Sequence, residues 1–176
     1  MAGRFLRARK SAETVLDREA SLSAADQMLG HSVALRSLAH VMAAESAHAL
    51  QDKTLRETHL VQAQREAEQA AGADRQTLLE GISLRAARWL IDDRDASASL
   101  EQLRQLPTSV SRRTVAMRLH LKAARLAGKP ELALDTALLL AKHRAFSPSA
   151  SQSLVRGLVL ELIASTHDDK ALEKLW

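Results

Sequence analysis

The sequence predicts an all-α fold built from antiparallel helix pairs. Of its 176 residues, 46% are hydrophobic and 26% are charged, which is typical of a folded soluble protein. Glycine (6) and proline (3) are scarce, aromatic residues make up only 2%, and alanine, leucine, arginine and glutamate favour helices. No segment shows the two-residue alternation of a strand. The breaks between helical segments are short, so consecutive helices should run antiparallel.

Local signals place the helices one after another along the chain. Pro130 and Pro148 suit the first turn of a helix, where a missing N–H costs nothing, and Ser147 is a candidate N-cap. The segment Ser21–His31 is a long connection whose conformation is not predicted. Helices are expected at residues 4–20, 32–51, 53–70, 74–92, 96–106, 110–127, 131–145, 149–165 and 168–176.

The helix pairs show a degenerate internal repeat. Gly128 is followed five residues later by Ala133, Gly3 by Ala8, and Asp93 by Ala98. A small residue at this position lets the second helix of a pair lie close to the first. The turns near residues 3, 51, 93, 128 and 167 are roughly 35–48 residues apart, a spacing typical of helical repeats. We therefore expect one repeat domain, residues 1–176, with approximate units 1–28, 32–70, 74–107, 110–145 and 149–176.

These offsets resemble the tetratricopeptide repeat, in which a turn precedes a small residue in the second helix of each pair. Trp89 stands where that family has an aromatic residue in its first helix. The resemblance implies that the pairs stack into a right-handed α-solenoid with the first helices lining a concave groove.

A more specific resemblance extends over most of the chain. The segments Gly3–Leu16, Ser37–Ala67, Ser83–Pro107 and Asp168–Trp176 are similar, in the same order, to segments of the HemY family. This family comprises membrane-anchored tetratricopeptide-repeat proteins encoded with haem biosynthesis genes in Gram-negative bacteria. The resemblance implies a scaffold for protein partners, among them haem-biosynthesis enzymes, at the bacterial inner membrane.

The family's membrane helices do not appear in this sequence. We expect a soluble fragment that faces the cytoplasm and is joined to the membrane only through segments outside it. The flavin-dependent oxidase that shares the family's name is not indicated, because the chain has no Gly-x-Gly-x-x-Gly motif.

Composition argues against several classes of function. The chain has no cysteine, which excludes disulfides, thiol catalysis and cysteine-based zinc sites. The net charge of +4 is modest, the basic residues alternate with acidic ones, and few aromatic side chains could stack on bases, so nucleic-acid binding is not expected. No uncharged apolar run has the roughly 18 residues of a membrane helix, and no signal peptide is recognisable.

No catalytic or metal-binding motif is recognisable. The seven histidines form no His-Glu-x-x-His motif, and the acidic cluster around Asp92, Asp93 and Asp95 suits a turn rather than acid–base catalysis. No Gly-x-Ser-x-Gly elbow or phosphate loop occurs. We expect no enzyme activity, metal site or cofactor.

A basic stripe gives the candidate binding site. Arg118, Lys122 and Arg125 are spaced i, i+4, i+7 and share one helix face. Counting from each turn places five further residues on the same concave side: Glu45, His48, Glu80, Ser83 and Glu161. Such a mixed-charge groove suits an acidic peptide, a helix or a carboxylate-bearing ligand.

Two interpretations of this groove remain open. It contacts protein partners, or it binds a tetrapyrrole through the carboxylates as a carrier or in a late step of porphyrin synthesis. The predicted core contains eight leucines: Leu119, Leu126, Leu132, Leu138, Leu139, Leu140, Leu158 and Leu162.

Overall fold

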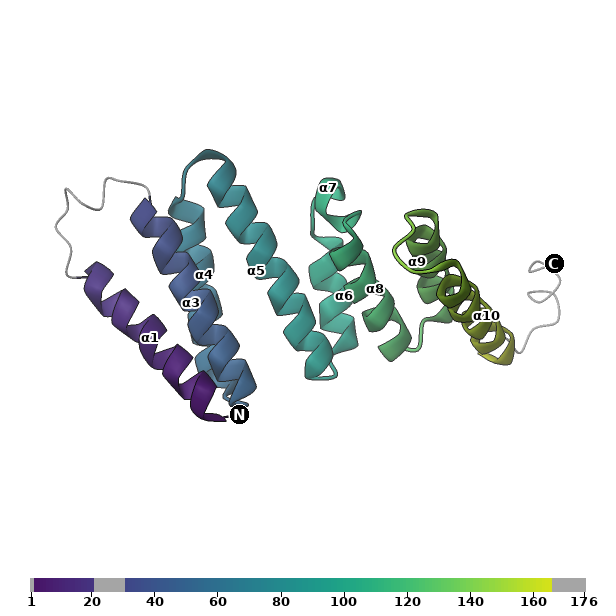
Figure 1. The fold of residues 1–176 in the computed structure, drawn as a ribbon, viewed down its shortest axis with the longest axis horizontal. Coiled ribbons are helices and arrows are strands. Elements are labelled where there is room, and N and C mark those ends of the chain that lie inside the picture. Colours follow the sequence, from purple (N-terminus) through teal and green to yellow (C-terminus); the bar gives the residue numbers. More distant parts are fainter. Residues whose placement is uncertain (1, 21–30, 166–176) are drawn as a thin grey trace. The chain divides into compact units, whose positions relative to one another are not determined.

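The computed structural model describes residues 2–20 and 31–165, and this part of the chain is helical with no strand (Figure 1). The prediction of an all-α fold is confirmed for these residues. The expected helix at 168–176 and the connection at 21–30 lie outside the described residues. The helices are α1 (Ala2–Ala20), α3 (His31–Ala49), α4 (Lys53–Gln69), α5 (Gly72–Asp92), α6 (Ala96–Arg104), α7 (Thr108–Ser111), α8 (Thr114–Leu126), α9 (Pro130–Lys142) and α10 (Pro148–Ser165).

Packing divides the chain into two compact units, Met1–Ala86 and Ala87–Trp176, and the division falls within α5. In the first unit, α3 lies against both α1 and α4 (Figure 1). Its core contains Val41, Ala63, Ala67 and Ile82. The buried Ser37 hydroxyl donates to the Ala63 carbonyl across the α3–α4 contact at 2.9 Å. A hydrogen bond to the backbone of a neighbouring helix is possible because the small residues of α4 let α3 come close.

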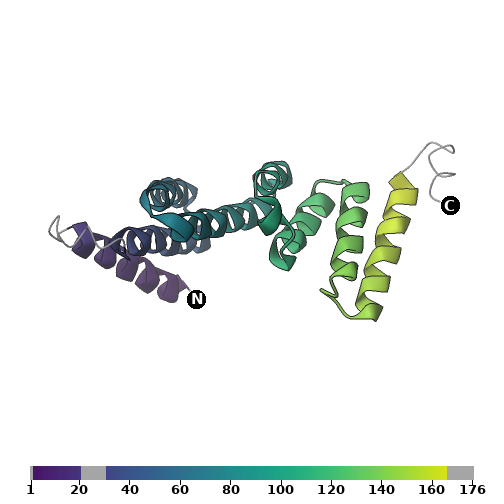
Figure 2. The ribbon, with the colours of Figure 1, turned by 90° about the horizontal axis from the view of Figure 1, so that it is seen from above.

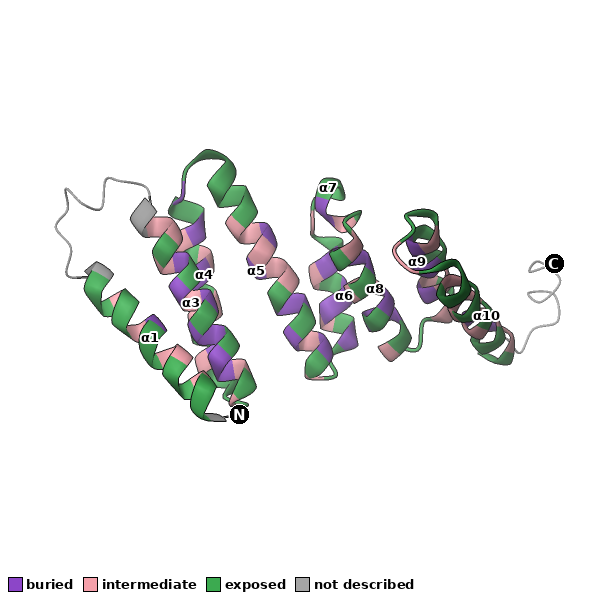
Figure 3. Ribbon diagram, in the orientation of Figure 1, coloured by how far each residue is buried: buried purple, intermediate pink, exposed green. Residues whose placement is uncertain are grey.

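The second unit has its own core, formed by α6, α8, α9 and α10 with the last part of α5. Figure 2 shows α8, α9 and α10 lying side by side. The buried residues of this core are Ile91, Leu100, Met117, Leu121, Ala123, Ala124, Ala133, Ala137, Leu140 and Leu158. Ser99, fully buried on α6, donates to the Ala87 carbonyl at 2.9 Å and repeats the serine-to-backbone contact of the first unit. Figure 3 shows the buried residues as stripes on the helices.

Four turns share one hydrogen-bond pattern. In each, a backbone N–H just past the helix bonds the carbonyl five residues before it, and the residue preceding that N–H has a positive φ. This is the Schellman arrangement, which usually takes glycine. Gly128 has φ 64°, whereas the other three positions hold side chains: Gln51 (φ 62°), Arg94 (φ 67°) and Arg144 (φ 52°).

Helix starts follow the local signals. Asp52 and Asp95 are the N-caps of α4 and α6, and each accepts a bond from a backbone N–H three residues on, at 3.0 Å. Pro130 is in the first turn of α9, and Ser147 Oγ accepts from Ala150 N at 3.3 Å before α10, as predicted.

Four details of the sequence analysis are wrong. The turn expected near residue 3 is not present, because Gly3 lies in the first turn of α1. The helix expected at 110–127 is divided into α7 and α8 by extended backbone at Arg113, where no glycine or proline marks a break. The small residue after the turn at Arg94 is Ser99 rather than Ala98, because that turn is centred one residue later than expected. Leu138 and Leu139 are about half exposed, because α9 buries the face formed by Ala133, Thr136, Ala137 and Leu140.

Buried Trp89, 3% exposed, is a packing residue as expected.

Within the described residues, no helix combines the length and apolarity needed to span a membrane.

Two glycine substitutions should change stability in opposite directions. Gly128 has a positive φ, so Gly128→Ala should lower the free energy of unfolding by about 1 kcal/mol even though nothing lies within 4 Å of an added Cβ. Gly157 lies inside α10 with the same open space, so Gly157→Ala should raise it by about 0.5–1 kcal/mol. Urea unfolding followed by circular dichroism measures both. Equal effects would contradict the conformation assigned to Gly128.

Two neighbouring leucines test the core of the second unit. Leu140 is 0% exposed and Leu139 is 50% exposed on the same helix. Leu140→Ala should cost about 2–5 kcal/mol, because it leaves a cavity among packed side chains. Leu139→Ala, the matched control, should change stability by no more than about 0.5 kcal/mol. Comparable losses in the two variants would contradict the packing of α9.

Candidate functional site

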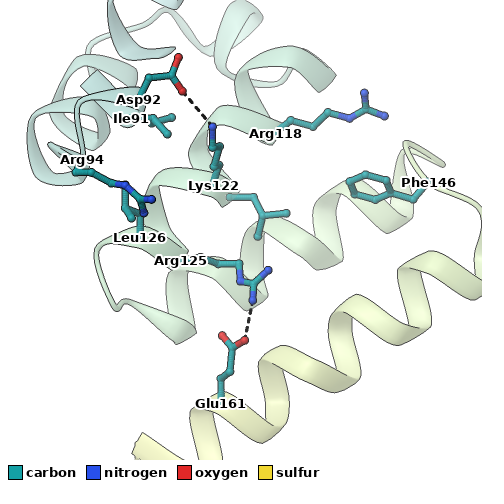
Figure 4. Close-up of a pocket in the computed structure, with 10 residues that line it drawn as sticks. Ile91, Asp92, Arg94, Arg118, Lys122, Arg125, Leu126, Phe146 and Glu161 are labelled. Carbon is teal, nitrogen blue, oxygen red and sulfur yellow. Dashed lines mark hydrogen bonds and ion pairs between the residues drawn. The ribbon is translucent and has the colours of Figure 1, made fainter. Parts of the chain in front are cut away.

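The candidate site is a groove in the second unit, beside α8. We call it the α8 groove: a cavity of about 970 Å³ lined by Ile91, Asp92, Arg94, Arg118, Leu121, Lys122, Arg125, Leu126, Phe146 and Glu161 (Figure 4). These residues come from the end of α5, from the α5–α6 turn, from α8, from the α9–α10 connection and from α10. The volume is at the upper end of the usual range for ligand pockets.

Helix α8 supplies the three predicted cations. One side of α8 is buried through Ala116, Met117, Leu121, Ala123 and Ala124. That burial leaves the stripe of Arg118, Lys122 and Arg125 to project from its more exposed side. The i, i+4, i+7 spacing brings all three side chains to one groove.

Each cation of the stripe is held by a group on another segment. Arg118 Nη2 donates to the Ala145 carbonyl at 2.7 Å, and the guanidinium lies 5.1 Å from the centre of the Phe146 ring. Lys122 Nζ lies 3.3 Å from Asp92 Oδ1, and Arg125 Nη2 lies 2.8 Å from Glu161 Oε1 (Figure 4). Arg118 is thus held by a backbone carbonyl and an aromatic ring, whereas Lys122 and Arg125 form exposed ion pairs.

The fourth cation is Arg94, in the turn between α5 and α6. Among the described residues, its guanidinium has no hydrogen-bond or ion-pair partner. The apolar lining consists of Ile91, Leu121, Leu126 and Phe146. Among the described lining residues the cations outnumber the carboxylates by two, so the groove favours an anion that also carries apolar groups.

Comparison with protein-family models, with curated proteins and with solved structures finds no match for this chain.

The structure brings together four of the eight predicted site residues: Arg118, Lys122, Arg125 and Glu161. The other four, Glu45, His48, Glu80 and Ser83, lie in the first unit. That all eight form one concave surface stays a prediction.

The first-unit residues have local partners. Glu45 Oε2 lies 3.9 Å from Arg85 Nε, and His48 Nδ1 lies 2.9 Å from Arg56 Nη1. Glu80 is buried and accepts a bond from Gln76 Nε2 at 2.9 Å, while Ser83 is half-buried. Of these four, Glu45 presents the most exposed charge.

Six groove residues lie outside the predicted set of binding residues: Ile91, Asp92, Arg94, Leu121, Leu126 and Phe146. Arg94 stands in an acidic cluster that we assigned to turn formation alone. A signal was present, because Arg94 takes the turn position that glycine takes at Gly128, which leaves a cationic side chain at the start of α6. Phe146 follows the positive-φ residue Arg144 by two positions, and no local pattern indicates its contact with α8.

Two histidines form an unexpected pair in the first unit. His40 on α3 and His59 on α4 have their Nδ1 atoms 3.0 Å apart and ring centroids 5.3 Å apart. One neutral ring can donate to the other, whereas two protonated rings would place donor against donor. Within the described part of the chain, no group of three or more His, Asp or Glu side chains could hold a metal ion.

Burial lowers the pKa of both rings below the ordinary value. For His40, the neighbouring His59 and Arg36 lower the pKa further, and Glu66 opposes them. For His59, Glu13 on α1 raises the pKa and Arg9 lowers it. Burial alone also lowers the pKa of His120, whose Nδ1 lies 2.9 Å from Thr136 Oγ1.

The histidine pair should make stability depend on pH. The unfolded chain binds protons at a higher pH than the folded pair does, so the free energy of unfolding should fall as pH drops from about 6.5 through the lowered pKa values. Replacing both rings (His40→Gln with His59→Gln) should reduce this slope, while His120 leaves part of it. Thr58→Gln, an exposed substitution on the same helix as His59, is the control and should retain the full slope. Urea unfolding at several pH values measures the slope of the free energy of unfolding against pH. An unchanged slope in the double variant would contradict the pairing.

Proposed function

We propose that this chain is a non-catalytic binding scaffold that holds an acidic segment of a protein partner in the α8 groove. The observation that carries the proposal is the combination in one groove of four cationic side chains with an apolar lining. The cations attract and orient carboxylates, and Ile91, Leu121 and Leu126 accept apolar side chains of the same segment. Arg118 is preorganised by Phe146 and the Ala145 carbonyl, which lowers the entropy lost on binding.

We further propose that the helix pairs form a tetratricopeptide-like right-handed α-solenoid with α8 as a first helix. The repeated turns at Gln51, Arg94 and Gly128 support this proposal, because each joins two helices with the same hydrogen-bond pattern. The buried small residues five positions after Arg94 and Gly128 support it as well. In such an array the first helices line the concave face, which is the usual surface for a bound segment.

The identity of the partners rests on the resemblance to the HemY family. On that ground we propose that the partners are haem-biosynthesis enzymes and that the domain works on the cytoplasmic side of the bacterial inner membrane. Membrane attachment would come from segments outside this sequence.

A tetrapyrrole is the second candidate for the α8 groove. The observation that favours it is the size of the cavity, about 970 Å³, together with an apolar lining and cations that could bind carboxylates. No histidine is among the described lining residues that could bind the iron of a haem. The affinity would therefore come from contacts of the carboxylates with the cations and of the macrocycle face with the apolar lining. A haem titration that leaves the haem absorbance unchanged would contradict this candidate.

Reversing the charge of the stripe should abolish partner binding. The triple variant Arg118→Glu, Lys122→Glu, Arg125→Glu should lose about tenfold or more in affinity, equivalent to about 1.4 kcal/mol or more. The control variant makes the same change in net charge at three exposed positions of α1, in the first unit: Arg4→Glu, Arg7→Glu, Lys10→Glu. Both variants, checked for helicity, are immobilised and exposed to purified haem-biosynthesis enzymes. Binding that survives in the groove variant, or is lost equally in the control, would contradict the role of the groove.

A further inference from the structure

The α8 groove contains two carboxylates of its own, and they stand where the carboxylates of a partner would bind. Asp92 lies at the end of α5, 3.3 Å from Lys122 Nζ, and Glu161 lies on α10, 2.8 Å from Arg125 Nη2. Figure 4 shows both contacts as dashed lines between residues that line the cavity. A segment that brings its own carboxylates would meet two cations that are already occupied.

These internal contacts are of the kind that exchanges easily. The side chains are 62% and 36% exposed in the Lys122–Asp92 pair, and 50% and 48% exposed in the Arg125–Glu161 pair. Ion pairs with this exposure contribute little net stability, because water solvates the separated charges nearly as well. Arg118 differs, since a backbone carbonyl and an aromatic ring hold it and no carboxylate has to leave.

Arg94 provides an entry point for the partner. It lines the same groove, and no described residue hydrogen-bonds or ion-pairs with its guanidinium. A carboxylate can therefore bind Arg94 before either internal contact opens. Long-range attraction by this cation raises the rate at which an acidic segment meets the groove. The carboxylates of the segment can then replace Asp92 at Lys122 and Glu161 at Arg125.

We propose that Asp92 and Glu161 are internal ligands of the α8 groove, displaced by the carboxylates of an acidic protein segment that binds Arg94 first. This inference rests on the proposed function and adds how the groove selects its occupant. A segment with a single carboxylate binds Arg94 alone. A segment with several carboxylates replaces Asp92 and Glu161 and gains the remaining cations, so the groove discriminates by charge density.

The test measures binding of a fluorescein-labelled peptide of leucine and glutamate, by fluorescence anisotropy, with a leucine–glutamine peptide as the neutral probe. Asp92→Asn with Glu161→Gln frees Lys122 and Arg125 while keeping side-chain size. The acidic peptide should then bind about two- to fivefold more tightly per freed cation, the range expected for exposed ion pairs. The double control Glu101→Gln with Asp135→Asn makes the same charge change in the same unit at exposed positions outside the groove lining, and should leave the affinity unchanged.

A second variant tests the entry point. Arg94→Gln should weaken the acidic peptide by about three- to tenfold and reduce the salt dependence of binding. The turn should tolerate glutamine, because Gln51 takes the same positive-φ conformation in the equivalent turn.

The outcomes separate this inference from the proposed function. Tighter binding by the double groove variant, with no change in the control, supports the inference. The inference is overturned if the wild type, the groove variant and the control bind the acidic peptide equally well and none of them binds the neutral peptide. That result leaves the acidic-segment function standing. No binding of the acidic peptide to any variant overturns both.

Discussion

Both units depend on the close approach of helices through small buried side chains. Ala63 and Ala67 on α4, and Ala133 and Ala137 on α9, are at most 1% exposed. Because an alanine side chain ends at Cβ, the backbones can come near enough for Ser37 to bond the Ala63 carbonyl in the first unit and for Ser99 to bond the Ala87 carbonyl in the second. An alanine side chain buries little apolar area, and larger buried residues such as Ile82, Ile91, Leu140 and Leu158 each bury more.

The same constraint positions the α8 groove. Burial of the alanine face of α8 determines which side of that helix remains accessible, and the cationic stripe lies on that side. The cations project from a helix whose rotation is fixed by packing, which keeps their spacing constant. The connection that supplies Phe146 is also ordered, because the turn at Arg144 is closed by backbone hydrogen bonds.

Most of the fold could be predicted from local signals. The helix starts at Asp52 and Ser147 depend on side-chain bonds to a backbone N–H three residues on, and the start at Pro130 depends on the fixed φ of proline. The break at Arg113 could not be predicted, because no glycine or proline marks it. The exposure of Leu138 and Leu139 could not be predicted either, because several apolar faces of α9 were equally plausible. Which face is buried is decided by the helices beside it.

The sequence by itself determined the helices, most of their ends and the i, i+4, i+7 stripe of α8, because these depend on residues at most a few positions apart. Only the tertiary structure decided what the stripe faces. Arg118 meets Ala145, Lys122 meets Asp92 and Arg125 meets Glu161 across 27, 30 and 36 residues of sequence. The pairing of His40 with His59 is likewise a contact between helices. Such contacts depend on how helices pack, and residue type alone does not encode which partners packing will bring together.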